Sequence, residues 1–139
     1  MTDAIVVSRR YDLPAEQVFD AWITPETAKR FLFATPTGTM VRTDIDARVG
    51  GRFTFTDRRN GDDIDHVGEY LEVDRPRRLV FSFAVPKFSA DYTTVAIDIA
   101  PTSGGCDLTL THTGVLPEWT ERTRQGWTKI LDALAASLA

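Results

Sequence analysis

The chain has 139 residues, of which 42% are hydrophobic and 26% charged, with 16 Lys plus Arg against 20 Asp plus Glu. This length fits a single domain over residues 1–139, and the composition excludes disordered and fibrous classes. The formal net charge of −4 argues against nucleic acid as a partner, because phosphate binding needs a concentrated basic surface. No apolar run approaches the roughly 20 residues of a membrane span, so we also expect no membrane insertion.

Cysteine usage and the N-terminal sequence point to a cytoplasmic protein. The single cysteine, Cys106, excludes an internal disulfide and is compatible with a reducing compartment. The first residues show no basic start followed by an apolar core, so no signal peptide is predicted. We expect a monomer, or a homodimer formed through an exposed sheet edge.

The first quarter of the sequence predicts one strand and two short helices. Residues 5–11 are rich in β-branched residues, which favours a strand. Pro14 suits the first turn of one helix, and Pro25 ends that helix and begins the next. The apolar positions at helical spacing are Val18, Phe19, Trp22 and Ile23 in the first helix and Ala28, Phe31 and Leu32 in the second.

From residue 40 onward the hydrophobic period changes to two, which is typical of strands. The alternation predicts strands at residues 40–46, 52–56, 66–73, 79–83, 95–99 and 106–112. Asn60-Gly61 and residues 103–105 are hairpin-turn signals, and Pro76 marks a further turn. Consecutive strands with short turns imply an antiparallel meander.

The last segment predicts a long amphipathic helix. Its apolar stripe consists of Trp119, Trp127, Ile130, Leu131, Leu134 and Leu138. Gly126 costs about 1 kcal/mol relative to Ala inside a helix. We expect Gly126 to allow a close approach of the helix to the sheet or to leave room for a ligand. The alternative is a tolerated surface glycine. Only this helix can cover the apolar face of the sheet, so we predict an α+β fold in which a curved antiparallel sheet of six to seven strands wraps around it.

Four segments, in this order, resemble the START-like (SRPBCC) superfamily, in the branch named for the activator of the ninety-kilodalton heat-shock-protein ATPase. They are residues 11–22, residues 49–53, residues 68–81, and residues 110–114 leading to Gly126-Trp127. The resemblance spans nearly the whole chain and implies a helix-grip fold with a cavity between sheet and helix. Members bind lipids and other apolar ligands, act as cyclases or serve as co-chaperones, so the resemblance implies much less about activity.

The apolar face of the predicted sheet supplies the candidate ligand contacts. Together with the helix, these candidates are Phe53, Phe55, Tyr70, Phe81, Phe83, Ile97, Leu110, His112, Trp119, Trp127 and Leu131. For any one of these residues taken alone, an ordinary core position is the favoured interpretation. A pocket requires that the sheet and the helix lie too far apart for side chains to fill the gap. We expect Trp119 to close its mouth, with Phe31, Phe33, Phe88 and Tyr92 as further candidates.

His112 is the sharpest single candidate, because its alternation with Leu108 and Leu110 turns the imidazole inward. A buried polar group needs a partner, which could be a ligand, a water, Arg42, Asp44, Glu69 or Tyr70. For the strand at residues 66–73, the sequence leaves two alternatives for the side chains that point inward. They are either His66, Gly68 and Tyr70, which add a hydroxyl to the pocket, or Val67, Glu69 and Leu71, which add a costly buried carboxylate.

The sequence carries no G-x-S-x-G, H-E-x-x-H, G-x-G-x-x-G or P-loop motif, and two histidines predict no zinc site. We therefore expect no metal and no cofactor. The favoured function is binding of a small hydrophobic or amphipathic molecule, oriented by His112 and Tyr70. One alternative is a cyclase, dehydratase or hydrolase that pairs His112 with Asp44 or Glu69. The other is a co-chaperone-like protein that stimulates a heat-shock-protein ATPase through the basic runs at residues 58–59 and 75–78.

Overall fold

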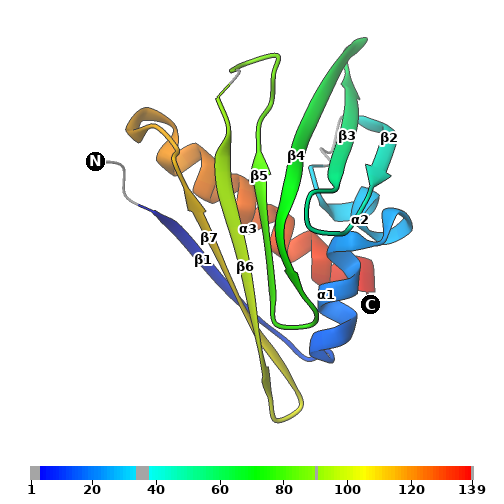
Figure 1. Cartoon of the computed structure of the whole chain (residues 1–139), viewed down its shortest axis with the longest axis vertical. Coiled ribbons are helices and arrows are strands. Elements are labelled where there is room, and N and C mark those ends of the chain that lie inside the picture. Colours follow the sequence, from blue (N-terminus) through cyan, green and yellow to red (C-terminus); the bar gives the residue numbers. More distant parts are fainter. Residues whose placement is uncertain (1–3, 34–37, 90, 139) are drawn as a thin grey trace.

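The structure, a computed structural model, describes residues 4–33, 38–89 and 91–138 (Figure 1). Its elements are β1 (Ile5–Tyr11), α1 (Ala15–Ile23), α2 (Pro25–Phe31), β2 (Thr39–Ile45), β3 (Arg52–Arg59), β4 (Asp62–Asp74), β5 (Arg78–Phe83), β6 (Thr93–Thr102), β7 (Gly105–Thr113), a 3-10 turn (Pro117–Trp119) and α3 (Thr120–Leu138). The predicted α+β class, the two short helices and the long C-terminal helix are confirmed.

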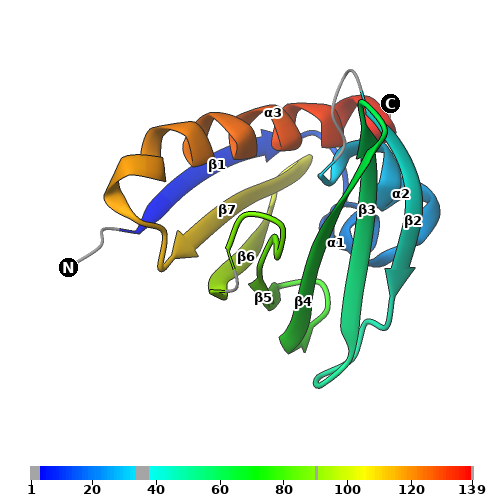
Figure 2. The ribbon, with the colours of Figure 1, turned by 90° about the horizontal axis from the view of Figure 1, so that it is seen from above.

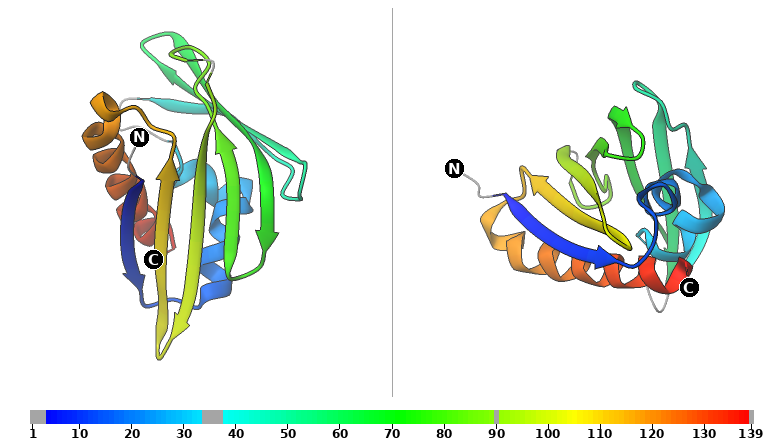
Figure 3. Two further views of the ribbon diagram at one scale, coloured as in Figure 1. Left: turned by 60° about the vertical axis from the view of Figure 1, so that its left-hand side comes forward. Right: turned by 90° about the horizontal axis from the view of Figure 1, so that it is seen from below.

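The strands form one antiparallel seven-stranded sheet in the order β1-β7-β6-β5-β4-β3-β2. Strands β2 to β7 follow one another as the predicted meander, while β1 pairs with the last strand. The register sets Ile5 opposite His112 and Tyr11 opposite Cys106. The first strand therefore lies beside the last one at one edge of the sheet (Figure 3).

The sheet curves around α3, which lies along β1 and reaches α2 with its C-terminal half (Figure 2). Three polar contacts fix the helix to the edge strand. Arg9 Nε lies 2.9 Å from Asp132 Oδ1, the Tyr11 hydroxyl donates to the Leu131 carbonyl at 2.8 Å, and Arg124 donates to the Val6 carbonyl at 3.1 Å. The helix thus spans the concave side from one edge of the sheet towards the other.

Strand β4 explains how the sheet bends. A Cβ added to Gly68 would lie 1.8 Å from the Ser82 carbonyl oxygen and 2.5 Å from the Phe53 ring. Only glycine permits this close approach of β4 to β5. Alternate β4 residues from His66 to Tyr70 are buried, so the inward set is His66, Gly68 and Tyr70.

Two sequence expectations need adjustment. Strands β3 and β4 run on to a hairpin at Asn60-Gly61, where φ is 53° and 84°, so both are longer than the hydrophobic alternation suggests. The favoured explanation for Gly126 is wrong, because an added Cβ would meet nothing within 4 Å. Gly126 is a tolerated surface glycine.

Candidate functional site

Aromatic rings from four strands and one helix, most of them buried, gather on the concave side of the sheet. The sequence-predicted members are Phe53 and Phe55 of β3, Tyr70 of β4, Phe81 and Phe83 of β5, His112 of β7 and Trp127 of α3. Most of these side chains are less than 4% exposed. Ile97, Leu110 and Leu131 are fully buried in the same core, so alternation along the strands placed the inner face correctly.

His112 lies inside a complete hydrogen-bond chain. The Trp127 indole Nε1 donates to His112 Nδ1 at 2.9 Å, and His112 Nε2 lies 2.6 Å from Thr93 Oγ1. Because Nδ1 accepts, Nε2 carries the proton and donates to Thr93, whose hydroxyl in turn donates to the Phe83 carbonyl at 3.2 Å. The partners are therefore Thr93 and Trp127 rather than the four side chains expected from the sequence.

Both histidines are held neutral by their surroundings. Burial lowers the pKa of His112 to about 4. Burial likewise lowers the pKa of His66 to about 4, against the opposing effect of a hydrogen bond from its Nδ1 to the Phe55 carbonyl at 3.3 Å. A neutral, fully engaged imidazole at His112 positions Trp127 and Thr93 more readily than it exchanges protons with a substrate.

Phe33, the second residue after α2, fills the centre of this aromatic cluster. It is 6% exposed, and its ring is parallel to those of His66 and Phe83, with interplanar angles of 11° and 2°. The rings nearest to it are His66 at 4.7 Å, Phe83 at 4.9 Å, Phe55 at 5.4 Å, Trp127 at 6.0 Å and Phe53 at 6.3 Å between centroids. Its backbone φ of 61° is left-handed, which is an outlier for a bulky side chain.

The space that the sequence analysis reserves for a ligand is therefore filled by side chains. A cavity of about 10 Å³ remains deeper in the core, with an apolar wall of Leu32, Phe53, Phe55, Leu79 and Phe81. Trp22 and Tyr70 also line it, and each brings one polar group. Burial raises the pKa of the Tyr70 hydroxyl. The cavity has room for about one water molecule.

Trp119 does not join the aromatic cluster. It is 49% exposed, and the Arg122 guanidinium lies 5.3 Å from its ring centroid. The residue belongs to the 3-10 turn rather than to α3, so the expected role at the pocket mouth is not supported. Phe88 and Tyr92 are also exposed, whereas Phe31 and Phe33 are buried.

A larger hollow, of about 420 Å³, lies on the opposite face of the sheet. Its wall includes Arg52, Glu69, Ser82 and Tyr92, from β3 to the segment before β6. Arg52, Glu69 and Ser82 occupy outward positions of the alternating strands, so Glu69 belongs to the outer face, and Tyr92 lies just before β6. The hollow is open and mixed in polarity.

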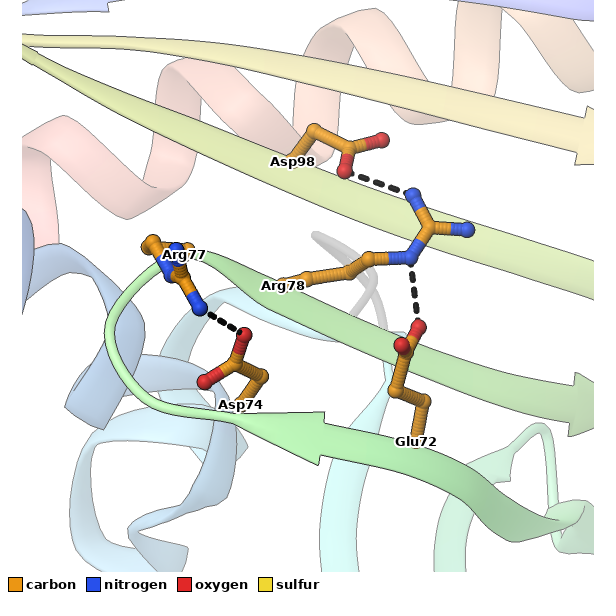
Figure 4. A network of polar contacts seen from close by, with 5 residues as sticks. All are labelled: Glu72, Asp74, Arg77, Arg78 and Asp98. Atoms are coloured by element: carbon orange, nitrogen blue, oxygen red, sulfur yellow. Dashed lines mark hydrogen bonds and ion pairs between the residues drawn. The ribbon is translucent and has the colours of Figure 1, made fainter.

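The basic runs proposed as chaperone contacts are engaged with the chain's own carboxylates. Figure 4 shows Arg78 between Glu72 and Asp98, at 2.5 and 2.6 Å, and Arg77 beside Asp74 at 2.7 Å. In the other ion pairs, Arg75 contacts Asp20 at 2.7 Å, Arg58 contacts Asp63 at 2.7 Å and Arg59 contacts Asp57 at 2.6 Å. Such neutralised arginines present little net positive charge to an acidic partner.

The acid–base pair of the enzyme alternative is not assembled. Asp44 forms an exposed ion pair with Arg42, and Glu69 lines the outer hollow. Within the described ranges, no three His, Cys, Asp or Glu side chains group closely enough to hold a metal ion. In that same part of the chain, no helix is both long and apolar enough to cross a membrane.

The helix-grip architecture and its closed aromatic core define the class of protein. The family model described as activator of Hsp90 ATPase homolog 1-like protein matches residues 12–139, and the chain belongs to this family.

Solved structures agree in fold. Protein CV1439 from Chromobacterium violaceum is 26% identical with a TM-score of 0.88, and the match covers 98% of this chain and 96% of that one. An AHSA1-like protein from Aeromonas hydrophila is 23% identical with a TM-score of 0.85, covering 98% and 92%. CalU16 from Micromonospora echinospora is 26% identical with a TM-score of 0.74, covering 98% and 76%. A search of curated proteins gave no match.

Proposed function

We propose that this protein binds a small, largely hydrophobic molecule between the sheet and α3, at the place that the Phe33 ring occupies in this structure. The observation that carries the proposal is the conformation of Phe33. A buried aromatic side chain is inserted among the concave-face rings from a left-handed backbone. Residues in such conformations persist only where the surrounding packing imposes them, and they cluster at ligand sites and switches.

The energies involved make displacement of Phe33 accessible. Withdrawing a buried Phe side chain from its contacts costs about 3–5 kcal/mol, because the loss of burial adds to the cost of the cavity left behind. Releasing the left-handed backbone returns about 1–3 kcal/mol. Because the relief of strain offsets part of this cost, a conformation with Phe33 withdrawn would be a minor state a few kcal/mol above the closed one, and a ligand that fills the cavity can select it.

The vacated site has the right size and lining for a small molecule. Withdrawal of the ring frees the volume of one benzene ring, bordered by His66, Phe83 and Trp127. Apolar cavities of about 150 Å³ in other proteins bind benzene without a polar contact. Family membership supports this function at the level of the class, since co-chaperone-like and ligand-binding roles both occur on this fold.

An NMR titration with toluene tests the proposal. In the wild-type protein, toluene should shift the resonances of Phe33, His66 and Phe83. Phe33→Gly removes the competing ring and relieves the strained φ, so its Kd for toluene should fall at least tenfold. Phe88→Gly removes a phenylalanine that is 70% exposed and should leave the Kd unchanged.

The proposal fails if folded Phe33→Gly protein binds no toluene, or if the shifted resonances lie around the outer hollow at Arg52 and Tyr92 instead. Should Phe33→Gly not fold, the wild-type titration decides alone. Mass spectrometry of compounds that copurify with the wild-type protein would then identify the natural ligand.

A further inference from the structure

The indole N–H of Trp22 is a buried donor that has no acceptor among the residues the structure describes. Trp22 is 1% exposed, and its Nε1 makes no hydrogen bond within the described part of the chain. A buried N–H left in this state costs about 1–3 kcal/mol, and such groups are rare in native proteins. The other buried indole, Trp127, has a partner in His112.

Packing prevents Trp22 from turning its N–H towards solvent. Its ring meets Phe31 edge-on at 5.3 Å and lies 6.5 Å from Trp127 between centroids. Both neighbours are buried, and the Trp22 backbone is part of α1. Packing therefore holds the donor in place, and its acceptor must be a group that enters the core beside it, either a water molecule or a ligand atom.

Trp22 lines the 10 Å³ cavity, and this cavity adjoins the Phe33 site. Phe53 and Phe55 belong to both, since they line the cavity and contact the Phe33 ring at 6.3 and 5.4 Å. Leu32, the residue before Phe33, also lines the cavity. The site that a withdrawn Phe33 would leave therefore borders the cavity that Trp22 lines.

We infer that the Trp22 indole N–H is the polar anchor of the ligand site, and that the ligand is an aromatic molecule with a neutral hydrogen-bond acceptor such as a ketone, ester or amide carbonyl. This inference rests on the proposed function. The ligand ring takes the place of Phe33 against His66 and Phe83, whose parallel rings lie 6.1 Å apart and form a flat aromatic floor. Its acceptor atom enters the cavity and receives the Trp22 hydrogen bond.

The uncharged wall of the cavity determines which class of hydrogen-bond acceptor can bind there. The residues that line the cavity include no Lys or Arg. An ionised carboxylate buried there would have no cation to compensate its desolvation, whereas a neutral carbonyl needs only one donor. Tyr70 lies on the same wall, and its hydroxyl is a second donor, beside the Trp22 N–H, for a carbonyl oxygen with two lone pairs.

Acetophenone and α-methylstyrene form the matched pair of probes, because they share a shape and differ in a carbonyl oxygen against a methylene. Without a hydrogen bond, α-methylstyrene should bind more tightly, since the carbonyl loses hydration on burial. With the Trp22 bond, acetophenone should bind at least as tightly. Trp22→Phe removes the donor but keeps a ring, and should reverse the order by about tenfold.

The indole N–H resonances of the wild-type protein give a readout that does not depend on the variant folding. Acetophenone should shift the Trp22 resonance strongly and α-methylstyrene should not, while exposed Trp119 serves as the internal control. Tighter binding of α-methylstyrene, or an unmoved Trp22 resonance when both probes bind, overturns the inference and leaves hydrophobic binding intact. If neither probe binds, the proposed function fails as well.

Discussion

Acidification should destabilise this protein well above the pH at which its carboxylates titrate. His66 and His112 have an ordinary pKa near 6.5 in the unfolded chain and about 4 in the folded protein, where burial disfavours the imidazolium. A depressed pKa means that the unfolded state binds protons first as the pH falls. Stability is therefore fully present above pH 6.5 and is lost progressively between about pH 6.5 and 4.

The size of the loss follows from the two pKa values. At pH 5 each histidine lowers the free energy of unfolding by about 2 kcal/mol, so the pair removes about 4 kcal/mol. Carboxyl groups contribute little in this window. Asp20, for example, has a pKa lowered by its hydrogen bond with Arg75, and it affects stability only as the pH falls to about 4, where the same carboxyl takes up a proton in the unfolded chain.

Urea denaturation at pH 7, 6 and 5 measures the effect. The wild-type free energy of unfolding should fall by about 4 kcal/mol between pH 7 and 5, and by about half as much in His66→Phe, which keeps an aromatic ring against Phe33. His112→Phe should be less stable at every pH because Trp127 and Thr93 lose a partner, yet it should show the same halved pH dependence. Equal wild-type stability at pH 7 and 5, or an unchanged slope in both variants, would refute the reasoning.

Three further substitutions test the packing by urea denaturation at pH 7. Gly126→Ala should stabilise the protein by about 1 kcal/mol, because the position is helical and open; a loss of stability would show a close contact there. Gly68→Ala, the same change in β4, should cost more than about 2 kcal/mol or prevent folding, since its Cβ would overlap the Ser82 carbonyl; a neutral effect would contradict the described bend. Tyr11→Phe should cost about 1 kcal/mol by removing the hydrogen bond to the Leu131 carbonyl, and an effect near zero would argue against that bond.

The sequence was sufficient to place the sheet and the inner face, because alternation along a strand is a local property. His112, Phe81 and Leu110 are buried as their positions require. The prediction that Trp119 lies on the apolar stripe of the last helix was wrong. The chain forms a 3-10 turn there, and the 3.6-residue period does not extend through it. Periodicity alone does not reveal where a regular helix begins.

The hydrogen-bond partners of His112 and the position of the Phe33 ring depend on contacts between elements that are distant in sequence. Thr93 is the first residue of β6, the strand paired with β7, and its bond to His112 depends on the register between these two strands. Phe33 was expected only as one candidate to close the pocket mouth, because its insertion depends on the left-handed backbone of this residue after α2. Trp22 was assigned correctly to a buried helix face, but only the three-dimensional structure shows that none of the described residues accepts its N–H.

The placement of β1 beside β7 has a consequence for synthesis on the ribosome. In the described sheet, β7 is the one strand neighbour of β1, so the opening segment stays without a pairing partner until residues around His112 have emerged. The hairpins from β2 to β6 can form earlier, because their contacts are close in sequence. A nascent chain therefore displays a bare, β-branched edge for most of its elongation, and we expect that interval to be its greatest exposure to mispairing with a neighbouring chain.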